Sequence, residues 1–495
     1  MASSAGSIAS IRGASSSPEQ GSDHPADETP LVVDVDGTLV ASDLLLEGIS
    51  RLAAASPLRL LLLPWWLARG RAYLKRQVSR ASSVRPESVP MNDSVLREVR
   101  HARESDRQVW LASGADDGVV APFADKIGAT GIIASDGTTN LIANKKARVL
   151  VGKFGVGGFD YIGNGRQDVP VWAQCRHASG VALSEGVRRR LQRMGLEPTL
   201  LAGQGGTAKD TIAALRPHQW VKNLLVFVPP LAAHSVDPMA YLFAAGAFLA
   251  LSLCTCGIYI FNDFLDLPHD RQHASKRRRP LASGRTPLGR TCALGLLATV
   301  AGLALAFALP GDTGAWILTY LAGALGYTLF AKRQYFLDVL VLASLYVLRI
   351  LVGGAAADIE ISPWLTAFSM FAFLGVATVK RLVELRGTST GPSTSVAGRA
   401  YVQEDAAGVL ALASASAFAS VVVLAVYIGS DEIVSRYANP ELLWLACPML
   451  IYWFGRLTLL ANRALVDDDP VAFAIRDKVS WIVGFGIAGV FLLSA

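Results

Sequence analysis

Charged side chains are scarce in this sequence of 495 residues. Asp, Glu, Lys and Arg make up 17% of it and hydrophobic residues 52%, whereas ordinary soluble proteins carry about 25% charged residues. The shortage is uneven, because residues 1–210 hold 47 charged side chains and the longer remainder, residues 211–495, holds 39. These numbers exclude a single soluble enzyme, a disordered chain and a fibrous one. They predict a soluble part followed by a membrane part.

Cysteine and histidine are also few. The five cysteines are too scattered for a disulfide framework, and the seven histidines show no metal-binding spacing. The first residues lack the basic and apolar regions of a secretory signal peptide, which predicts a start that faces the cytoplasm. A pI near 9.1 is compatible with nucleic-acid binding. The basic residues cluster between apolar runs, however, so we expect a membrane and no nucleic acid as partner.

The first 205 residues divide into a tail and a folded domain. Residues 1–29 are rich in Ser, Ala, Gly and acidic residues and predict a disordered tail. Residues 30–205 alternate apolar runs with helical patterns, which predicts an α/β Rossmann-like domain with a parallel sheet between helices. The expected strands are residues 31–33, 108–112, 131–133, 159–162 and 170–172, and the expected helices include 93–105 and 145–153.

One apolar segment does not fit a soluble domain well. Residues 58–67 read LRLLLLPWWL, and four cations follow within the next nine residues. The run is too short to span a bilayer, which needs about 20 apolar residues. Two interpretations of residues 50–80 stay open. They form either a buried helix of a cap subdomain or a helix in the membrane interface, with its tryptophans at the headgroups.

Residues 211–495 alternate long apolar stretches with short polar loops. Most stretches are long enough to cross a bilayer, and together they predict an all-α bundle of about nine transmembrane helices. They lie near residues 223–233, 239–261, 291–309, 314–331, 336–356, 363–378, 409–428, 442–460 and 479–495. Loops on one side carry sixteen Lys and Arg, and loops on the other side carry one. Cytoplasmic loops are the basic ones, so we expect a multi-pass inner or plasma-membrane protein with a cytoplasmic soluble domain and an extracytoplasmic C-terminus.

The most specific pattern in the membrane part is acidic. Asn262, Asp263, Asp266 and Asp270 follow the second apolar stretch directly. On a helix that continues past the membrane, carboxylates three and four residues apart face one side, where they repel one another unless a cation neutralises them. Mg²⁺ binds carboxylates together with phosphate oxygens, so the motif predicts a Mg²⁺ site.

Basic residues gather around this acidic motif. Such residues anchor membrane proteins on the cytoplasmic side, and beside a metal they also bind phosphate or diphosphate. An arginine within a membrane helix is costly and usually faces a cavity or a partner. The candidate substrate-binding residues are Lys222, Asn262, Arg278, Arg279, Lys332, Arg349 and Lys380.

These motifs resemble those of the UbiA superfamily of membrane transferases. The resemblance covers residues 211–495, and the opening at residues 216–223 is most similar to the branch that contains decaprenyl-phosphate phosphoribosyltransferase. It implies a Mg²⁺-dependent enzyme acting on a polyprenyl phosphate or diphosphate. Asp263 and Asp266 would be catalytic, and Asp270 would bind the metal and diphosphate with them.

The branch also implies a reaction, in which a lipid phosphate attacks C1 of phosphoribosyl diphosphate and diphosphate leaves. Residues 379–384 lack the second Asp-rich motif of ordinary prenyltransferases. That absence disfavours transfer of a polyprenyl group from its diphosphate to an aromatic acceptor without excluding it. A third hypothesis is a non-catalytic lipid-binding or transport protein. Transporters often contain inverted repeats, and none is visible in the sequence.

A second motif lies in the soluble part. Residues 34–38 read DVDGT and follow an apolar run, at the position where α/β sheets place their sites. The motif resembles the phosphatase signature of the haloacid dehalogenase superfamily over residues 30–200. Ser113, Lys146 and Asp168 follow in the order of that family's motifs, with Lys145 as the competing choice for the lysine. The resemblance implies that Ser113 and Lys146 bind the transferred phosphate.

The same resemblance assigns roles to the acidic residues. Asp34 would be a nucleophile that forms an aspartyl-phosphate, and Asp36 would be the acid and base. Asp34, Asp36 and Asp168, with the Val35 carbonyl, would form the Mg²⁺ site. Asn164 stands where many relatives carry Asp, which weakens that site, so a degenerate domain is the alternative. We expect a phosphomonoester phosphatase that acts on a substrate or product of the membrane domain.

Overall fold

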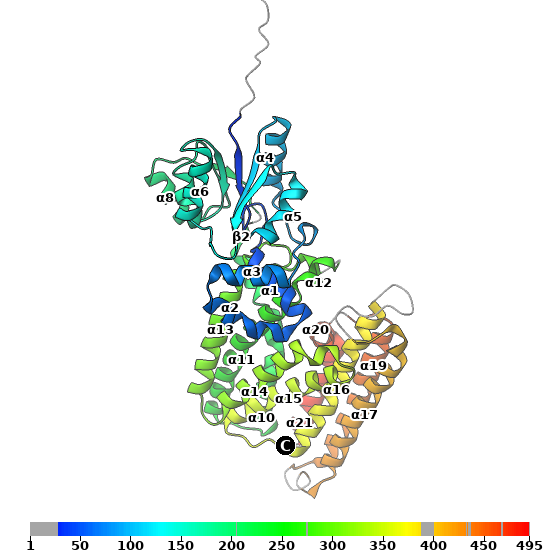
Figure 1. Ribbon diagram of the computed structural model, residues 1–495. Coiled ribbons are helices and arrows are strands. Elements are labelled where there is room, and N and C mark those ends of the chain that lie inside the picture. Colours follow the sequence, from blue (N-terminus) through cyan, green and yellow to red (C-terminus); the bar gives the residue numbers. More distant parts are fainter. Residues whose placement is uncertain are drawn as a thin grey trace, which may run out of the picture.

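The computed structural model describes residues 28–203, 205–273, 276–387, 400–431, 433, 437–466 and 469–494. The predicted disordered tail lies almost entirely outside these residues. Figure 1 shows an α/β domain seated on one end of a long helical bundle. We call this end of the bundle the proximal end, and the opposite end, where the C-terminus lies, the distal end.

A six-stranded sheet with all its paired strands parallel forms the centre of the α/β domain, in the order β3-β2-β1-β4-β5-β6. The strands are β1 (Leu31–Asp34), β2 (Val109–Asp116), β3 (Gly131–Ser135), β4 (Asp160–Gly163), β5 (Ala178–Val181) and β6 (Thr199–Leu201). The strand order reverses between β1 and β4, and α/β sheets bind their ligands at such a point. The predicted Rossmann-like class is confirmed.

Helices cover both faces of this sheet. One buried cluster joins the strands to α4 and α5, through residues such as Val99 and Phe123, and the other joins them to α6, α7 and α8. The helical elements of the domain are α1 (Leu44–Ala55), η1 (Pro57–Leu62), α2 (Leu63–Ala68), α3 (Arg71–Ala81), η2 (Pro86–Ser88), α4 (Asp93–Glu104), α5 (Asp117–Ile127), α6 (Asn144–Phe154), η3 (Arg166–Asp168), α7 (Val169–Trp172) and α8 (Glu185–Arg193).

One expected strand is wrong. Residues 170–172 lie in the short helix α7, and the last two strands come later in the chain. Pro170 occupies the first turn of that helix, where a missing N–H costs nothing, and Val171 and Trp172 are fully buried. A three-residue apolar run has no period of its own, so helix and strand read alike there.

The bundle contains seven helices long and apolar enough to cross a membrane among the described residues. They are Pro238–Leu265 (α11), Leu288–Ala308 (α13), Thr313–Arg333 (α14 with η6), Leu337–Ala357 (α15), Pro363–Gly387 (α16), Gln403–Ile428 (η7 with α17) and Pro440–Asn462 (η8 with α19). The last segment, α20 (Pro470–Arg476) with α21 (Lys478–Ser494), is bent by 81° and makes an eighth span if counted as one.

The expected count of nine spans is therefore an overcount. The first expected span forms the 3₁₀ helix η4 (Pro217–Phe227) and the short helix α10 (Val228–Ala232), which follow α9 (Ala208–Ala214). Two consecutive prolines, Pro229 and Pro230, stand within the first turn of α10. Because proline lacks the N–H that an α-helix needs, this segment does not extend into one long helix.

Buried polar contacts join the two domains. Both guanidinium N–H groups of Arg271, on α12 (Leu267–Gln272), donate to the Glu47 carboxylate on α1, at 2.8 and 2.6 Å. Glu47 is fully buried. The Ser50 hydroxyl donates to the Phe264 carbonyl at the end of α11, at 2.6 Å. The α/β domain is therefore fixed to the proximal end by α1, directly beside the acidic motif.

Substitution of Glu47 tests this attachment. Glu47→Ala leaves Arg271 buried without its carboxylate, which typically costs about 3–5 kcal/mol. We expect a clearly lower midpoint of thermal unfolding for the purified, detergent-solubilised protein. Glu185→Ala is the matched control, because the Glu185–Arg189 pair is exposed on both sides and such pairs contribute about 1 kcal/mol or less. Equal midpoints for the two variants would contradict the assignment.

Candidate active sites

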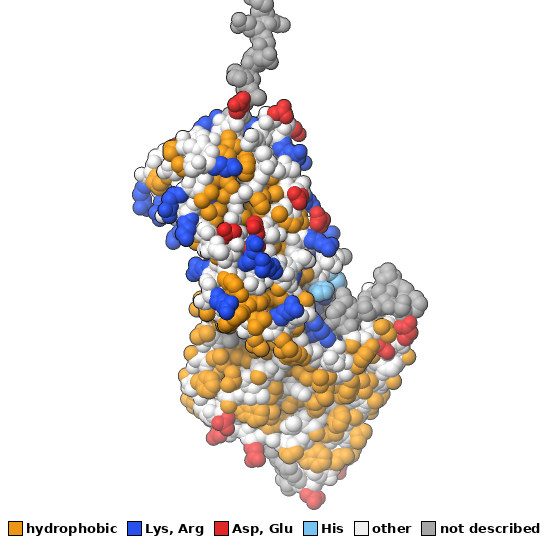
Figure 2. All heavy atoms as spheres, in the orientation of Figure 1, with side chains coloured by type: hydrophobic (Ala, Val, Ile, Leu, Met, Phe, Trp, Pro, Cys, Tyr) orange, Lys and Arg blue, Asp and Glu red, His pale blue; other side chains and the backbone are white. Residues whose placement is uncertain are grey.

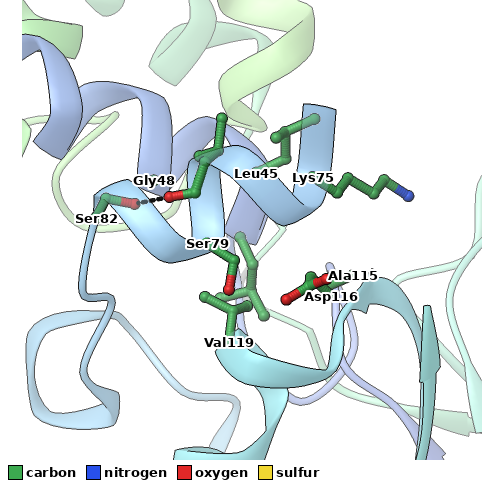
Figure 3. Close-up of a pocket in the computed structure, with 10 residues that line it drawn as sticks. Leu45, Gly48, Lys75, Ser79, Ser82, Ala115, Asp116 and Val119 are labelled. Atoms are coloured by element: carbon green, nitrogen blue, oxygen red, sulfur yellow. Dashed lines mark hydrogen bonds between the residues drawn. The ribbon is translucent and has the colours of Figure 1, made fainter. Parts of the chain in front are cut away.

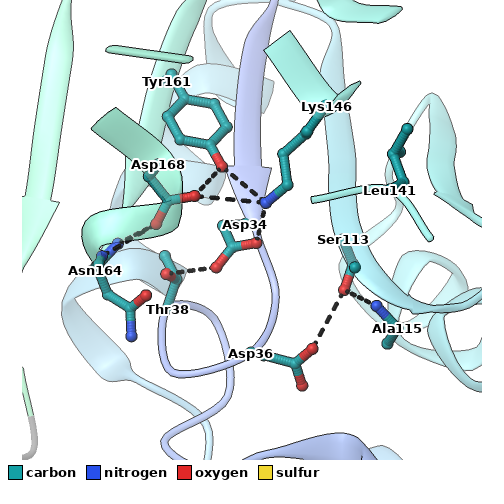
Figure 4. Close-up of polar contacts among 12 residues, drawn as sticks. Asp34, Asp36, Thr38, Ser113, Ala115, Leu141, Lys146, Tyr161, Asn164 and Asp168 are labelled. Carbon is teal, nitrogen blue, oxygen red and sulfur yellow. Dashed lines mark hydrogen bonds and ion pairs between the residues drawn. The ribbon is translucent and has the colours of Figure 1, made fainter. Parts of the chain in front are cut away.

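The α/β domain gathers charged side chains at the carboxyl end of its central strand. Asp34 ends β1, and its carboxylate accepts hydrogen bonds from the Thr38 hydroxyl at 3.0 Å and from the Lys146 ammonium at 2.6 Å (Figure 4). Asp34 and Lys146 are 5% and 4% exposed. The fold thus brings a strand end and the helix α6 together around one buried ion pair.

Asp168 completes this group from the turn η3. One carboxylate oxygen accepts from the Tyr161 hydroxyl at 2.7 Å and lies 3.4 Å from the Lys146 ammonium. The other accepts from the backbone N–H groups of Asn164 and Gly165, each at 3.0 Å (Figure 4). These bonds hold the carboxylate in one orientation, directed at the ammonium.

Asp36 lies on the turn that follows β1. Its carboxylate accepts from the backbone N–H of Leu44, the first residue of α1, at 2.8 Å and from the Ser113 hydroxyl at 3.4 Å (Figure 4). A helix N-terminus favours a negative group. Ser113 is fully buried in β2, so the predicted phosphate-binding hydroxyl and the predicted acid/base lie next to each other.

Gly37 makes this turn possible. Its φ is +73°, and a Cβ at this position would lie 2.0 Å from the side-chain nitrogen of Asn164. Only glycine allows both the backbone conformation and the close approach. Asn164, the departure from the family pattern, therefore packs directly against the motif that it accompanies.

Burial sets the protonation of the two acidic groups. Loss of water, partly offset by Lys146, raises the pKa of Asp34 to about 6. Burial, and next the neighbouring Asp43, raise the pKa of Asp36 to about 7. Burial by itself would lower the pKa of Lys146, but its two carboxylate neighbours raise it above the ordinary value, so this lysine stays charged.

Two of these carboxylates fit a cation. Among the described residues no three carboxylates, imidazoles or thiols surround one point closely enough to hold a metal alone. Mg²⁺ needs fewer, because one or two carboxylates suffice when phosphate and water complete its shell. Asp34 and Asp168 converge on the Lys146 nitrogen at 2.6 and 3.4 Å, so a cation between them is compatible with the geometry. The Asp36 carboxylate is hydrogen-bonded to Leu44 and Ser113 instead.

Lys75 is a site residue that sequence reasoning missed. It belongs to α3, and its ammonium donates to the Gly114 carbonyl at 2.5 Å and to the Asn140 side chain at 2.8 Å. The positive charge of Lys75 also favours the ionised form of Asp36. The residue stood in a run of cations after the apolar segment, and nothing in that run separates it from its neighbours. Only the packing of α3 over β2 brings it to the site.

The acidic motif of the membrane part is paired with cations at the proximal end. Arg216 forms an ion pair with Asp263, and one nitrogen of Arg279 lies 3.1 Å from Asp263 and 2.6 Å from Asp270. Both carboxylates are about 4% exposed. Two carboxylates that converge on one nitrogen fit a Mg²⁺ ion as well, by the same reasoning as in the α/β domain.

Asp266 departs from the expected single face. The helix breaks at this residue, between α11 and α12, and the Asp266 carboxylate pairs with Lys332 of η6 (Ala331–Arg333) at 2.7 Å. Asp266 and Lys332, two of the predicted site residues, are thus paired with each other, but Asp266 does not share the Arg279 nitrogen that Asp263 and Asp270 contact. Asn262 is half-buried one residue before the cluster, and Arg278 is exposed beside it.

The remaining candidates form two other groups. Lys222 forms an ion pair with Asp469 at 2.5 Å. Lys380 is close enough to interact electrostatically with both of these residues. Asp469, which ends an acidic run, is a second residue that sequence reasoning missed. Arg349 instead donates to the Asn223 side chain at 3.0 Å and to the Tyr320 hydroxyl at 2.7 Å. These contacts lie inside the bundle, and the phosphate-binding role of Arg349 stays a prediction.

Protonation of Asp36 should change stability with pH. A carboxyl whose folded pKa is raised from 3.8 to about 7 stabilises the fold at pH values below its unfolded pKa, and this contribution is lost as the pH rises through 7. We expect the parent protein, freed of metal by chelation, to lose thermal stability between pH 5 and pH 8 relative to Asp36→Asn. Parallel melting curves for the two proteins across this range would contradict the assignment.

Comparison with known proteins identifies the membrane part. Residues 225–430 match the UbiA prenyltransferase family. The chain is 35% identical over 475 residues to the uncharacterized protein y4nM of Sinorhizobium fredii, which covers 94% of this chain and 91% of that protein.

Two further likenesses concern the separate parts. The chain is 30% identical over 298 residues to the decaprenyl-phosphate phosphoribosyltransferase of Mycobacterium tuberculosis, over 57% of this chain and 94% of that protein. The structure of a substrate-bound phosphoserine phosphatase aligns with 35% of this chain, and the alignment includes 92% of the phosphatase chain. The sequence identity is 11% and the TM-score is 0.26. With its proximal acidic motif and its apolar helices, the chain belongs to the UbiA prenyltransferase family.

Proposed function

We propose that the membrane domain transfers a phosphoribosyl group from phosphoribosyl diphosphate to a polyprenyl phosphate with the help of Mg²⁺. The observation that carries the proposal is the group of Asp263, Asp270, Arg216 and Arg279 at the proximal end. Similarity to decaprenyl-phosphate phosphoribosyltransferase over nearly its whole length supports the substrate choice. The proximal end would face the cytoplasm, where the basic loops belong.

The chemistry asks mainly for electrostatic stabilisation. An oxygen of the lipid phosphate attacks C1 of the ribose, and the bond from C1 to the diphosphate breaks. Asp263 and Asp270 would hold Mg²⁺, which neutralises the leaving diphosphate. Arg216, Arg279 and Lys332 would compensate the rest of its charge, since fixed charges at the developing anion are usually the largest catalytic contribution.

Removal of the Asp263 carboxylate tests this site. Asp263→Asn should lower phosphoribosyl transfer at least about a hundredfold, because such charges contribute on the order of a hundredfold or more. The assay follows labelled phosphoribosyl diphosphate into lipid in vesicles that contain polyprenyl phosphate and Mg²⁺. Asp312→Asn is the control, since Asp312 is exposed in the distal loop between α13 and α14. Unchanged turnover in Asp263→Asn would contradict the metal assignment.

The donor itself needs a separate experiment. The parent protein receives phosphoribosyl diphosphate with polyprenyl phosphate, or polyprenyl diphosphate with an aromatic acid. Product from the first pair alone supports the proposal. Product from the second pair alone would instead establish aromatic prenylation.

For the α/β domain we propose hydrolysis of a phosphomonoester. Asp34 would attack phosphorus and form an aspartyl-phosphate, while Asp36 gives its proton to the departing oxygen and later takes one from the attacking water. Ser113 and Lys146 would bind the phosphate oxygens. The two raised carboxyl pKa values, about 6 and about 7, allow one group to be ionised and the other protonated near neutral pH.

Asp34→Asn tests this second activity. The variant should lose phosphomonoesterase activity by at least about a thousandfold, because the nucleophile itself is removed. Release of inorganic phosphate by the purified full chain is the measurement. Asp125→Asn is the control, since Asp125 is exposed on α5. No hydrolysis by the parent would support a degenerate domain.

A further inference from the structure

An exposed apolar surface lies where the two domains meet. It consists of Leu58, Leu61, Leu62, Trp65 and Leu67 on η1 and α2, with exposed fractions of 66, 76, 43, 50 and 51%. Contiguous exposed apolar side chains of this size mark a partner or a lipid surface. Figure 2 shows them as an orange patch, bordered by cations, between the charged domain and the apolar bundle.

The opposite side of the same segment is firmly seated. Trp66 is 7% exposed and packs with buried residues of α1 and α3. Leu60 packs against the buried cluster of Ala53 on α1 and Phe264 and Leu265 on α11. Side chains of α13 and α14, Cys292 and Leu329, pack against the same cluster. The segment is therefore held beside the proximal end of α11, and its exposed side chains point away from the protein.

The apolar surface continues along the bundle. Leu296 and Val300 of α13, which packs against the same buried cluster as Leu60, are 67% and 57% exposed. These side chains belong to a helix with the length and composition of a membrane span, so lipid covers them. The exposed leucines of η1 and α2 continue this lipid-facing apolar surface to the level of the headgroups.

The charge of the segment agrees with a bilayer surface. Residues 57–80 contain six cations and no carboxylate. Arg59, Arg69 and Arg71 are exposed, and the Arg69 guanidinium lies 4.0 Å from the centroid of the Trp65 ring. Tryptophan and arginine at the edge of an apolar patch are typical of interfacial helices on anionic membranes.

The same segment packs on the helix that borders the candidate phosphatase site. α2 packs on α3, and Lys75 of α3 donates to the carbonyl of Gly114, next to Ser113 in β2. Figure 3 shows the seam between α3 and β2, lined by Lys75, Ala115, Asp116 and Val119. Its cavity of about 10 Å³ holds roughly one water molecule. α3 is thus packed closely against β2 beside the candidate site.

We propose that η1 and α2 lie in the interface of an anionic bilayer and that the phosphatase site beside α3, the helix on which they pack, acts on a phosphomonoester carried by a membrane lipid. The inference about the substrate rests on the phosphatase function proposed above. It names a substrate class for that site, which includes a lipid-linked phosphoribose made by the membrane domain.

The membrane position is tested by a nitroxide label on Leu61→Cys in the full chain, reconstituted in phosphatidylcholine–phosphatidylglycerol nanodiscs. The label should collide more with oxygen than with a water-soluble nickel chelate. Val156→Cys is the control, because Val156 is 72% exposed in the loop after α6 and should prefer the chelate. The parent protein, treated with the same label, shows how much signal comes from its own five cysteines. Equal behaviour of the two labels would overturn the position.

The substrate class is tested with two probes that share one phosphomonoester. They are polyprenyl-linked phosphoribose in vesicles and ribose 5-phosphate in solution. Leu61→Asp combined with Trp65→Asp should lower hydrolysis of the lipid-borne probe about tenfold or more and leave the soluble probe unchanged. Equal effects on both probes would overturn the inference. No hydrolysis of either probe by the parent would instead refute the phosphatase function, while the label would still decide the position.

Discussion

Buried carboxylates held by fixed cations are the constraint on which this structure depends. Asp34 faces Lys146 in the sheet domain, Asp263 lies between two arginines at the proximal end, and Glu47 receives Arg271 between the domains. A buried charge without a partner costs several kcal/mol. Each element that supplies a partner is therefore held in place. The ion pairs of the two candidate sites thus also stabilise the fold.

This constraint also explains why the two domains form one unit. Arg271 follows Asp270 directly, and its partner Glu47 lies on the helix whose first N–H binds Asp36. The acidic motif and the turn that carries Asp36 are thus connected by α1, through one ion pair and one backbone hydrogen bond to a carboxylate. Movement of one candidate site would therefore alter the packing of the other.

Sequence reasoning worked where a pattern has a period or a fixed spacing. The helices at residues 93–105 and 145–153 and seven of the expected spans were predicted because each extends one local pattern over many residues. The short strand before Asp34 was predicted because the DVDGT motif follows it directly. It failed for residues 170–172, which are too few to show a period, and for residues 223–233, where prolines interrupt the helix. Lys75 and Asp469 carry no local signal, since partners distant in the chain define their positions.

The sequence by itself determined that the protein has a soluble α/β part and a membrane part, and it identified the acidic motifs of both. Composition and short-range spacing are enough for this, because solvent and local geometry act residue by residue. Only the tertiary structure decided which cation neutralises which carboxylate, that Asp266 turns to Lys332, and that Arg349 is engaged with Tyr320. These choices depend on which helices pack together, and that is a property of the whole chain.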